Sequence, residues 1–430
     1  REDVLFGAPF RLRLSEGASY REVLLDGPPE SATAVLTDVD GDGDEDLLLL
    51  AAGNEWPAGS PRYRHYLYRN DGAGQYVLLA PERLPLPDAP VLAAASTDFD
   101  GDGRPDLFIG GSLKPQHYPQ HSPSTVLLNR SVNGRIGYLP LPVSLPAEVG
   151  PVRAAVAFSD AVLFVNDFGV PTRLRVVDGK CQLEPLPGTE HLQGWWRSLA
   201  VVDVDGDGDL DVVAGNQGKN HALVASLEHP VRLYLNDYDA NGRADPVLSR
   251  YYTDRREYPV APRGLLTQQM PGIKRRFPTY RAYAEAEMDA LFTVEERRGE
   301  VCYRATTMES MLLVNNGNGT FTPRPLPRLA QQAPLQDLLP TDLDGDGDLD
   351  LLALCGDRSG NVRLGYADGV PFIRLRNDGH GLFTAELITT PPWDRYRDGR
   401  ALARLADGSC VVAANDGLVF PLPSVSKRAD

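Results

Sequence analysis

Hydrophobic positions along the chain occur in short blocks of two kinds. Four blocks are continuous apolar runs that end in glycine, and they begin at Asp46 (DLLLLAAG), Asp106 (DLFIGG), Asp211 (DVVAG) and Asp350 (DLLALCG). Runs of this length predict strands that are buried on both faces. Other blocks, such as YLYR, MLLV and IRLR, alternate apolar and polar residues and precede an Asn-Asp-Gly or Asn-Asn-Gly turn. These blocks predict strands of β-hairpins.

The blocks recur in one order along the chain. A strand is followed by an acidic loop, a second strand, a connection, a third strand, an Asn-Asp-Gly turn and a fourth strand. Four antiparallel strands in about 45 to 65 residues are typical of a β-propeller blade. The sequence therefore predicts an all-β protein, a single β-propeller domain over residues 1–430 with six four-stranded blades, or seven if upstream sequence is missing.

The repeat also predicts where each blade begins and ends. The third blade has no acidic loop, because the segment from Val152 to Asp167 matches the start of a blade with that loop removed. Residues 1–30 are expected to supply outer strands that close the ring. The fourth blade carries an insertion at about 246–305, whose apolar spacing and prolines predict two or three short helices. The predicted blades are 31–90, 91–148, 149–193, 194–333, 334–392 and 393–423.

The loop after the first strand of most blades has a nine-residue acidic frame of the form DxDGDGxxD. Carboxylates at positions 1, 3 and 5 converge when the chain curls tightly, and glycines at positions 4 and 6 allow that curl. A hard divalent cation with oxygen ligands relieves the repulsion between these carboxylates. Calcium fits better than magnesium, because it accepts roughly six to eight oxygens in flexible geometry. We therefore expect four to five bound Ca²⁺ ions.

Side chains at positions 1, 3, 5 and 9 and the backbone carbonyl at position 7 are the expected ligands. A carbonyl ligand explains why position 7 is arginine in two copies. The predicted metal-binding residues are Asp38, Asp40, Asp42, Asp44 and Asp46; Asp98, Asp100, Asp102, Arg104 and Asp106; Asp203, Asp205, Asp207, Asp209 and Asp211; Asp237, Asp239, Asn241, Arg243 and Asp245; and Asp342, Asp344, Asp346, Asp348 and Asp350.

Two other interpretations of these frames were weighed. An EF-hand loop ends with Glu at position 12 and lies between helices, whereas no copy here has Glu at that position and a strand follows each frame. Paired catalytic carboxylates are the second alternative. The regular spacing favours structural calcium loops that join one strand to the next.

Composition narrows the class of partner. The chain has 430 residues, 42% of them hydrophobic, and a formal net charge of −16, which disfavours nucleic acid and acidic membranes as partners. Five calcium ions would leave a net charge of about −6. No apolar run approaches the roughly 18 to 20 residues of a transmembrane segment. The four cysteines, Cys181, Cys302, Cys355 and Cys410, lack CxxC spacing and predict no zinc site.

The acidic frames and the NDGxGxF hairpins resemble FG-GAP (VCBS) repeats, which occur in integrin α-subunit propellers and many bacterial secreted proteins. Longer segments that begin at Gly53, Gly194, Leu233 and Pro271 are similar to VCBS repeat proteins of Bacteroidota-type bacteria. Those proteins often carry an ASPIC/UnbV module and are relatives of cartilage acidic protein. The resemblance covers almost the whole chain. It implies a secreted or outer-membrane-associated propeller and supplies no catalytic residue.

One polar and aromatic set is a candidate ligand surface, because stacking aromatic rings beside amides suit carbohydrate binding. The alternative is that one or both tryptophans pack between blades. The set is Trp195, Trp196, Asn216, Gln217, Asn220 and His221. A second aromatic and basic loop contains Trp56, Arg62, Tyr63, His65 and Tyr66.

The sequence contains no HExxH, GxSxG, P-loop or strand-to-helix GxGxxG motif. We therefore favour an extracytoplasmic, non-catalytic binding or assembly module for a glycan or protein at the cell surface. A polysaccharide lyase or hydrolase is the first alternative, and a lyase would need a basic or histidine cluster around the central channel. A structural subunit of an outer-membrane complex, docked through the insertion, is the second alternative.

Overall fold

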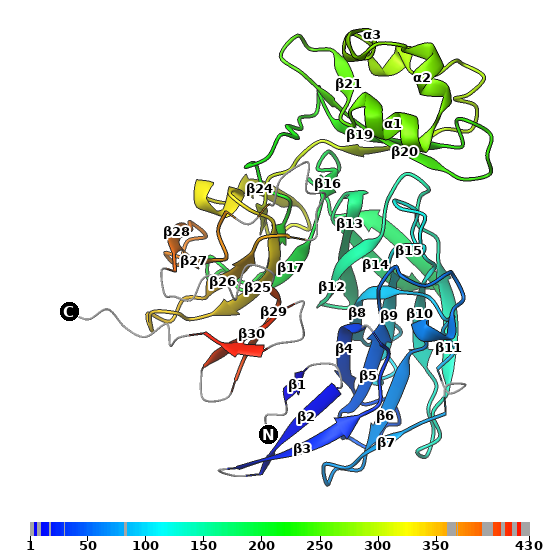
Figure 1. The fold of residues 1–430 in the computed structure, drawn as a ribbon. Helices are drawn as coiled ribbons and strands as arrows, with labels where there is room; N and C mark the ends of the chain where they lie inside the picture. The colour runs from blue at the N-terminus through cyan, green and yellow to red at the C-terminus, as the bar shows by residue number, and fades with distance from the viewer. Residues whose placement is uncertain are drawn as a thin grey trace.

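The computed structural model describes residues 4–6, 10–16, 19–29, 31–80, 84–358, 367, 369–388, 399–405, 409–414 and 419–422. The described chain is dominated by β-strands that form separate antiparallel sheets (Figure 1). This arrangement confirms the predicted all-β fold built from propeller blades.

Five of the sheets each contain the four strands of a complete blade. Their order along the chain matches the predicted repeat. The first is β4 (Ser31–Thr37), β5 (Asp46–Ala51), β6 (Tyr66–Asn70) and β7 (Tyr76–Leu78); the second is β8 (Val91–Thr97), β9 (Asp106–Gly111), β10 (Ser124–Asn129) and β11 (Tyr138–Val143). The third is β12 (Val152–Phe158), β13 (Ala161–Gly169), β14 (Thr172–Val177) and β15 (Lys180–Pro185), with the short β16 (Gly194–Trp195) paired to β13. The fourth is β17 (Ser198–Val202), β18 (Asp211–Gly215), β23 (Met311–Asn315) and β24 (Phe321–Pro325); the fifth is β25 (Leu335–Thr341), β26 (Asp350–Cys355), β27 (Phe372–Arg376) and β28 (Thr384–Leu387).

The first strands of successive blades lie innermost. β4 contacts β8, β8 contacts β12, β12 contacts β17, β17 contacts β25, and β25 contacts β29 (Gly399–Arg404). Figure 1 shows these strands around a common centre, with the fourth strands outward. Each blade therefore places the start and the end of its first strand at opposite mouths of one central space.

The two ends of the chain form three-stranded sheets. These are β1 (Val4–Phe6), β2 (Phe10–Glu16) and β3 (Ser19–Leu25), and β29 with β30 (Cys410–Ala414) and β31 (Val419–Pro421). Leu25 packs with Leu47 and Leu49 of the first blade, whereas Val412 packs with Leu352 of the fifth. Within the described strands no ladder joins the two terminal sheets, so their pairing stays a prediction.

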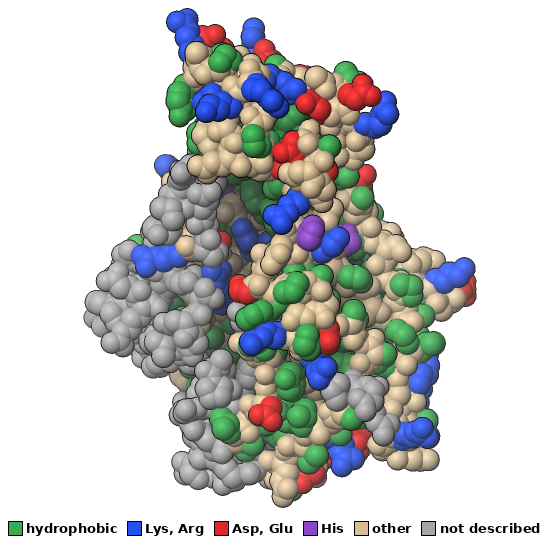
Figure 2. All heavy atoms as spheres, turned by 45° about the vertical axis from the view of Figure 1, so that its right-hand side comes forward, with side chains coloured by type: hydrophobic (Ala, Val, Ile, Leu, Met, Phe, Trp, Pro, Cys, Tyr) green, Lys and Arg blue, Asp and Glu red, His purple; other side chains and the backbone are tan. Residues whose placement is uncertain are grey.

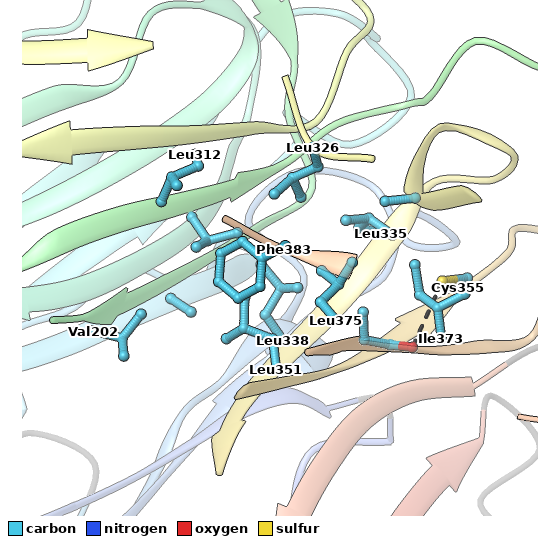
Figure 3. Close-up of a cluster of buried hydrophobic side chains, with 14 of the residues drawn as sticks. Val202, Leu312, Leu326, Leu335, Leu338, Leu351, Cys355, Ile373, Leu375 and Phe383 are labelled. Atoms are coloured by element: carbon cyan, nitrogen blue, oxygen red, sulfur yellow. Dashed lines mark hydrogen bonds between the residues drawn. The ribbon is translucent and has the colours of Figure 1, made fainter. Parts of the chain in front are cut away.

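The second strand of a blade is buried on both faces because neighbouring blades cover it. Every residue of β5, β9, β18 and β26 is buried, which accounts for their continuous apolar sequences. Between the fourth and fifth blades, Val202, Leu312 and Leu351 pack against Phe383 (Figure 3). Full burial of one such side chain stabilises the fold by roughly 1.5 to 3 kcal/mol.

The third blade lacks an acidic loop, as its sequence predicts. Phe158 of β12 pairs with Ala161 of β13, so Ser159 and Asp160 alone make the turn. Ser159 has a φ of 53°, which belongs to the left-handed region used in tight hairpins. A two-residue turn thus takes the place of the nine-residue frame in this blade.

The inserted segment is larger than its helical sequence pattern indicates. Ala214 of β18 pairs directly with Met311 of β23, so residues 216–310 leave the fourth blade and return to it. They form a sheet of β19 (Val231–Asn236), β20 (Asp245–Tyr251), β21 (Glu257–Pro259) and β22 (Val301–Ala305). The short helices of the insertion are α1 (Arg263–Gln269), α2 (Gly272–Arg276) and α3 (Tyr280–Ala284), and a 3₁₀ turn, η3 (Met288–Ala290), follows them. Two other 3₁₀ turns, η1 (Pro61–Tyr63) and η4 (Arg328–Gln331), lie outside the insertion.

The looser acidic frame at Asp237 therefore joins β19 to β20 in the inserted sheet and does not lie in a blade. The local sequence of this hairpin resembles that of a blade. Only its pairing partners distinguish the two, because β19 pairs with β22 of the same insertion.

Candidate metal loops and candidate binding face

The first aspartate of each blade frame organises the curl of its loop. In the first loop, the Asp38 carboxylate accepts backbone hydrogen bonds from Gly41 at 2.7 Å and Gly43 at 3.0 Å. These glycines have φ values of +80° and +92°, which a residue with a Cβ rarely adopts. Asp98, Asp203 and Asp342 bind the corresponding glycines in the same way.

The last aspartate of each blade frame connects the loop to the third strand. Asp46 accepts the backbone N–H of Val39 and the backbone N–H of Asn70, both at 2.8 Å. Asp106, Asp211 and Asp350 make the equivalent pair of contacts. Burial, with a smaller contribution from neighbouring carboxylates, raises the pKa of both Asp46 and Asp106 to about 6. A nearby cation would favour the charged form of these groups.

Each of the five frames brings three carboxylates together, with one oxygen from each lying within 4.8 Å of the others. Asp40 Oδ1, Asp344 Oδ1 and Asp245 Oδ2 are enclosed and have no hydrogen-bond donor among the residues that the structure describes. Unpartnered, converging anionic oxygens are the donor set that a hard cation requires. The residues present therefore fit a divalent cation. The groups are Asp38, Asp40 and Asp42; Asp98, Asp100 and Asp106; Asp203, Asp205 and Asp211; Asp237, Asp239 and Asp245; and Asp342, Asp344 and Asp350.

Positions 5 and 7 have supporting contacts in these loops. Asp42 accepts the backbone N–H of Asp44 at 3.0 Å, and the side chain of Asp44 lies against Gly72 of the following hairpin. Asp209 and Asp348 lie against Gly317 and Gly379 in the same way, and Asp207, Asp346 and Asn241 accept the N–H of position 7 as Asp42 does.

The second loop differs because two arginines pair with its carboxylates. Arg130 donates to Asp102 at 2.9 Å and also pairs with Asp100, and Arg104 pairs with Asp102. These guanidinium groups occupy oxygens that a metal ion would otherwise bind. The second loop is therefore electrostatically the least available of the blade loops.

The frame in the insertion is supported from a helix. Gln269 of α1 donates to Asp245 at 3.0 Å. Tyr238, at position 2 of the frame, stacks on Phe292 with ring centroids 3.7 Å apart. This loop is therefore fixed to the helical part of the insertion.

The longest connections gather on the face opposite the blade loops. The acidic loops join first strands to second strands, so in an antiparallel blade the connections from second to third strands lie at the other end. The fully described ones are 52–65 in the first blade, 112–123 in the second and 216–310 in the fourth. We call this surface the connection face, and the insertion stands on it (Figure 1).

The predicted ligand residues divide between core and surface. Trp196 is fully buried and donates from Nε1 to the carbonyl of Gly169 at 2.9 Å. Asn216 is also fully buried, and its amide donates to the carbonyls of Thr307 and Glu309. Trp196 thus links the fourth blade to the third, and Asn216 links the start of the insertion to its end. Because both side chains are buried in these contacts, neither offers a surface for a ligand.

The other four predicted residues lie nearer the surface. Trp195 is half-buried and packs on Phe168 with ring centroids 5.2 Å apart, and Asn220 is exposed. Gln217 accepts two hydrogen bonds from Arg197 at 3.0 and 2.9 Å. His221 accepts the N–H of Leu223 at Nδ1, and its burial lowers its pKa.

The second aromatic loop is only partly available. Tyr63 and His65 are buried, and His65 Nδ1 accepts the N–H of Ala51 at 3.1 Å. Arg62 lies over the ring of Trp56 at 4.0 Å from its centroid. Trp56 and Arg62 therefore form the accessible part of this loop.

Three arginines that the sequence interpretation missed lie on the connection face. Arg153 and Arg400 are the extra residues at β-bulges that open β12 and β29, and Arg197 directly precedes β17. The signal was present in the repeat, because Arg197 lies six residues before Asp203, as the bulged Leu92 does before Asp98. Aligning the repeats at this position would have shown the arginines.

Two segments match models of one repeat family. Residues 23–109 match the model described as FG-GAP-like repeat, and residues 195–224 match the FG-GAP repeat model. These two segments are therefore similar to FG-GAP repeats. The first matched segment holds the loop at Asp38 and most of the loop-bearing hairpin at Asp98, and the second holds the loop at Asp203.

Two solved structures are similar to this chain over 98% of its length. One is the extracellular domain of the hybrid two component system BT4673 from B. thetaiotaomicron, with 10% identity and a TM-score of 0.32. The other is the extracellular domain of the one component system BT4673 from the same organism, with 13% identity and a TM-score of 0.31. The chain spans 49% and 44% of those chains. No curated protein matches the chain.

Within the described residues, the helices are too short and too polar to cross a membrane. The described cysteines are free thiols, and Cys355 and Cys410 are buried.

Proposed function

We propose that this protein is an extracytoplasmic, calcium-stabilised binding module for a glycan or a protein at the cell surface. The observation that carries this proposal is the segregation of the two ends of the blades. One end holds short, regular acidic loops, whereas the other holds the long connections and the insertion. Loops on a rigid scaffold are where binding functions concentrate.

Calcium is the cation that the acidic loops fit best, because all of the available donors are oxygen atoms and several come from carboxylates. Bound calcium would hold the connection between the first two strands of a blade. Calcium sites in extracellular modules commonly bind at about 10⁻⁴ to 10⁻³ M, which suits a location outside the cytoplasm. The expected ligands are those listed above for the four blade frames and, with less charge because of Asn241, the inserted frame.

Calcium binding has a direct test. Calcium added to chelator-treated protein should raise the unfolding temperature, because a ligand of the folded state stabilises it by mass action. Magnesium at the same concentration should raise it less. An unfolding temperature unchanged by calcium would contradict a stabilising role for the loops.

Tyr118 lies beside Arg153 and Asp167 on the connection face. Burial and the Asp167 carboxylate raise the pKa of Tyr118 well above its usual value. Tyr118 therefore stays protonated and donates to Asp167 at 3.2 Å. The three arginines of this face are the basic cluster that a lyase would need, so the release of sugar fragments is the measurement that separates the two functions.

The binding function is tested by retention of glycans and envelope proteins on immobilised protein in millimolar calcium. The test variant is Trp56→Ala with Arg62→Ala, which removes the accessible pair on the connection face. The matched control is Leu349→Ala, an exposed residue in the fifth-blade acidic loop. Unfolding temperatures would establish that both variants are folded.

We expect a partner that the wild type and Leu349→Ala retain and that the double variant binds more weakly. Loss of the partner in Leu349→Ala alone would place recognition on the acidic-loop face and contradict the proposal. Release of shortened sugar fragments would instead favour a polysaccharide-active enzyme. A partner that binds all of these substitution variants but needs the intact insertion would favour the structural-subunit alternative.

A further inference from the structure

Three arginines occupy equivalent positions at the mouth of the central space. Arg153 and Arg400 are bulge residues of innermost strands, and Arg197 has the equivalent place in the fourth blade. The corresponding residues of the first, second and fifth blades are Ala32, Leu92 and Gln336, which carry no charge. A bulge re-aims a side chain away from the regular ladder, and bulges are common beside binding sites.

The guanidinium of Arg197 is held by a neutral partner. Its Nε and Nη2 donate to Gln217 Oε1, and the nearest carboxylate contact is Asp357 at 3.9 Å. Asp357 is shared, because Arg400 also approaches it at 3.5 Å. Arg197 is therefore positioned by hydrogen bonds without a close carboxylate of its own among the described residues.

Positive charge exceeds negative charge in this cluster. Arg153 forms a two-bond pair with Asp167 at 2.8 and 2.6 Å, and Asp357 faces both remaining arginines. The five described groups thus carry a net charge of +1. Burial, followed by the nearby Arg153, lowers the pKa of Arg197, whereas Asp167 and Asp357 act in the opposite direction.

An indole donor beside the arginines is also unpartnered. Trp195 pairs with Asp167 across the β13–β16 ladder, and its Nε1 is enclosed without an acceptor among the described residues. The side chains of Arg153 and Arg197 are 21% and 15% exposed, so the protein covers neither of them completely. Figure 2 shows the surface hollowed beneath the insertion, with basic side chains at its edge.

We propose that Arg197, with Arg153 and Arg400, binds the carboxylate of an acidic sugar on the connection face. The inference rests on the proposed binding function and names the ligand class. Arg153 uses Nε and Nη2 on Asp167 and Arg197 uses the same atoms on Gln217, so the ligand carboxylate would meet the Nη1 side of each guanidinium, where arginine again presents two parallel N–H donors. The partly exposed ring of Trp195 supplies an apolar surface next to these donors, which suits a sugar ring better than a free inorganic anion.

The test is titration calorimetry of the whole chain in saturating calcium. The probes are glucuronate, galacturonate and mannuronate, each beside its methyl ester, which keeps the sugar and removes the charge. Inorganic sulfate and an oligoglutamate peptide test other sources of an anion. The variants are Arg197→Gln and Arg400→Gln, and the control is Arg298→Gln, which makes the same charge change at an exposed position of the insertion.

We expect at least one uronate to bind, its ester to bind far more weakly, and Arg197→Gln to lose roughly thirtyfold or more in affinity. Arg400→Gln should weaken binding in the same direction, and Arg298→Gln should bind as the wild type does. Uronates that fail to bind, esters that bind equally, or tighter binding of sulfate or oligoglutamate would overturn the inference. An envelope ligand that binds the connection face but ignores Arg197→Gln would overturn this inference alone and leave the binding module standing.

Discussion

The side-chain amide of Asn377 donates a hydrogen bond to the carbonyl oxygen of Val204 at 2.7 Å, and this contact joins the fifth blade to the acidic loop of the fourth. The backbone N–H of the same residue donates to Asp350 in its own blade at 2.8 Å. Asn129 makes the same pair of connections, to Val39 of the first blade and to Asp106 of its own. The asparagine that ends a third strand can therefore fasten two acidic loops at once.

Asn377→Ala is expected to destabilise the protein by about 1.5 kcal/mol, because it removes a buried hydrogen bond between two blades, while the Val204 carbonyl keeps the backbone N–H of Gly381 as a donor. The matched control is Asn315→Ala, since the Asn315 amide donates to Leu210 in its own loop at an exposed position. Its cost should be smaller, about 1 kcal/mol or less. Chemical denaturation in saturating calcium measures both free energies of unfolding, and equal costs would contradict a role in joining blades.

Gly72→Ala is expected to distort the first acidic loop. Gly72 has a φ of +72°, and a Cβ at this position would lie 2.3 Å from Asp44 Oδ2. Gly59→Ala is the control, because Gly59 has a φ of +75° with nothing within 4 Å of the added carbon. Both variants bear a left-handed backbone cost of roughly 1 to 2 kcal/mol, so only the difference reports on the loop.

We expect Gly72→Ala to unfold at a lower temperature than Gly59→Ala and to bind less calcium at the first loop. Thermal unfolding with and without calcium, together with calcium titration, measures the two effects. Similar behaviour of the two variants would show that the contact with Asp44 is unimportant.

Arg130→Gln is expected to strengthen metal binding at the second loop. Arg130 pairs with both Asp100 and Asp102, and its positive charge opposes a divalent cation at the same oxygens. Removing it should increase calcium affinity roughly tenfold at low ionic strength. Arg135→Gln makes the same charge change at an exposed residue of the next turn and should leave affinity nearly unchanged. Calcium titration measures the affinity of each variant. Unchanged or weaker calcium binding in Arg130→Gln would show that Arg130 does not compete with the ion for these oxygens.

His65 is expected to make stability depend on pH. Burial lowers the pKa of His65 to about 4, and the neutral ring accepts the N–H of Ala51. Between the ordinary value near 6.5 and about 4, the unfolded chain binds a proton that the folded chain does not. The stability that the neutral, buried His65 contributes is therefore present above pH 6.5 and is lost as the pH falls from about 6.5 to about 4.

The comparison is wild type with His65→Gln at pH 7 and pH 5 in saturating calcium. From pH 7 to pH 5 the wild type should lose about 2 kcal/mol more stability than the variant. His191→Gln, at an exposed histidine, should keep the pH profile of the wild type. If the free energies of unfolding of the wild type and His65→Gln change equally with pH, His65 is not the source of the pH dependence.

Much of the molecule follows from short stretches of sequence. The curl of the loop at Asp38 depends on its own carboxylate and on Gly41 and Gly43, all within six residues. The buried second strands follow from uninterrupted apolar runs, and the hairpins follow from the Asn-Asp-Gly turns. These elements were predictable because the interactions that form them are local or repeat with a fixed period.

Tertiary structure alone decided the features that depend on distant partners. The insertion begins at 216 because Ala214 pairs with Met311, a contact that no local pattern reveals. Trp196 is buried because Gly169, from the preceding blade, accepts its indole N–H. Arg153, Arg197 and Arg400 converge because innermost strands meet around one centre, and residues separated widely in sequence become neighbours only when the blades pack.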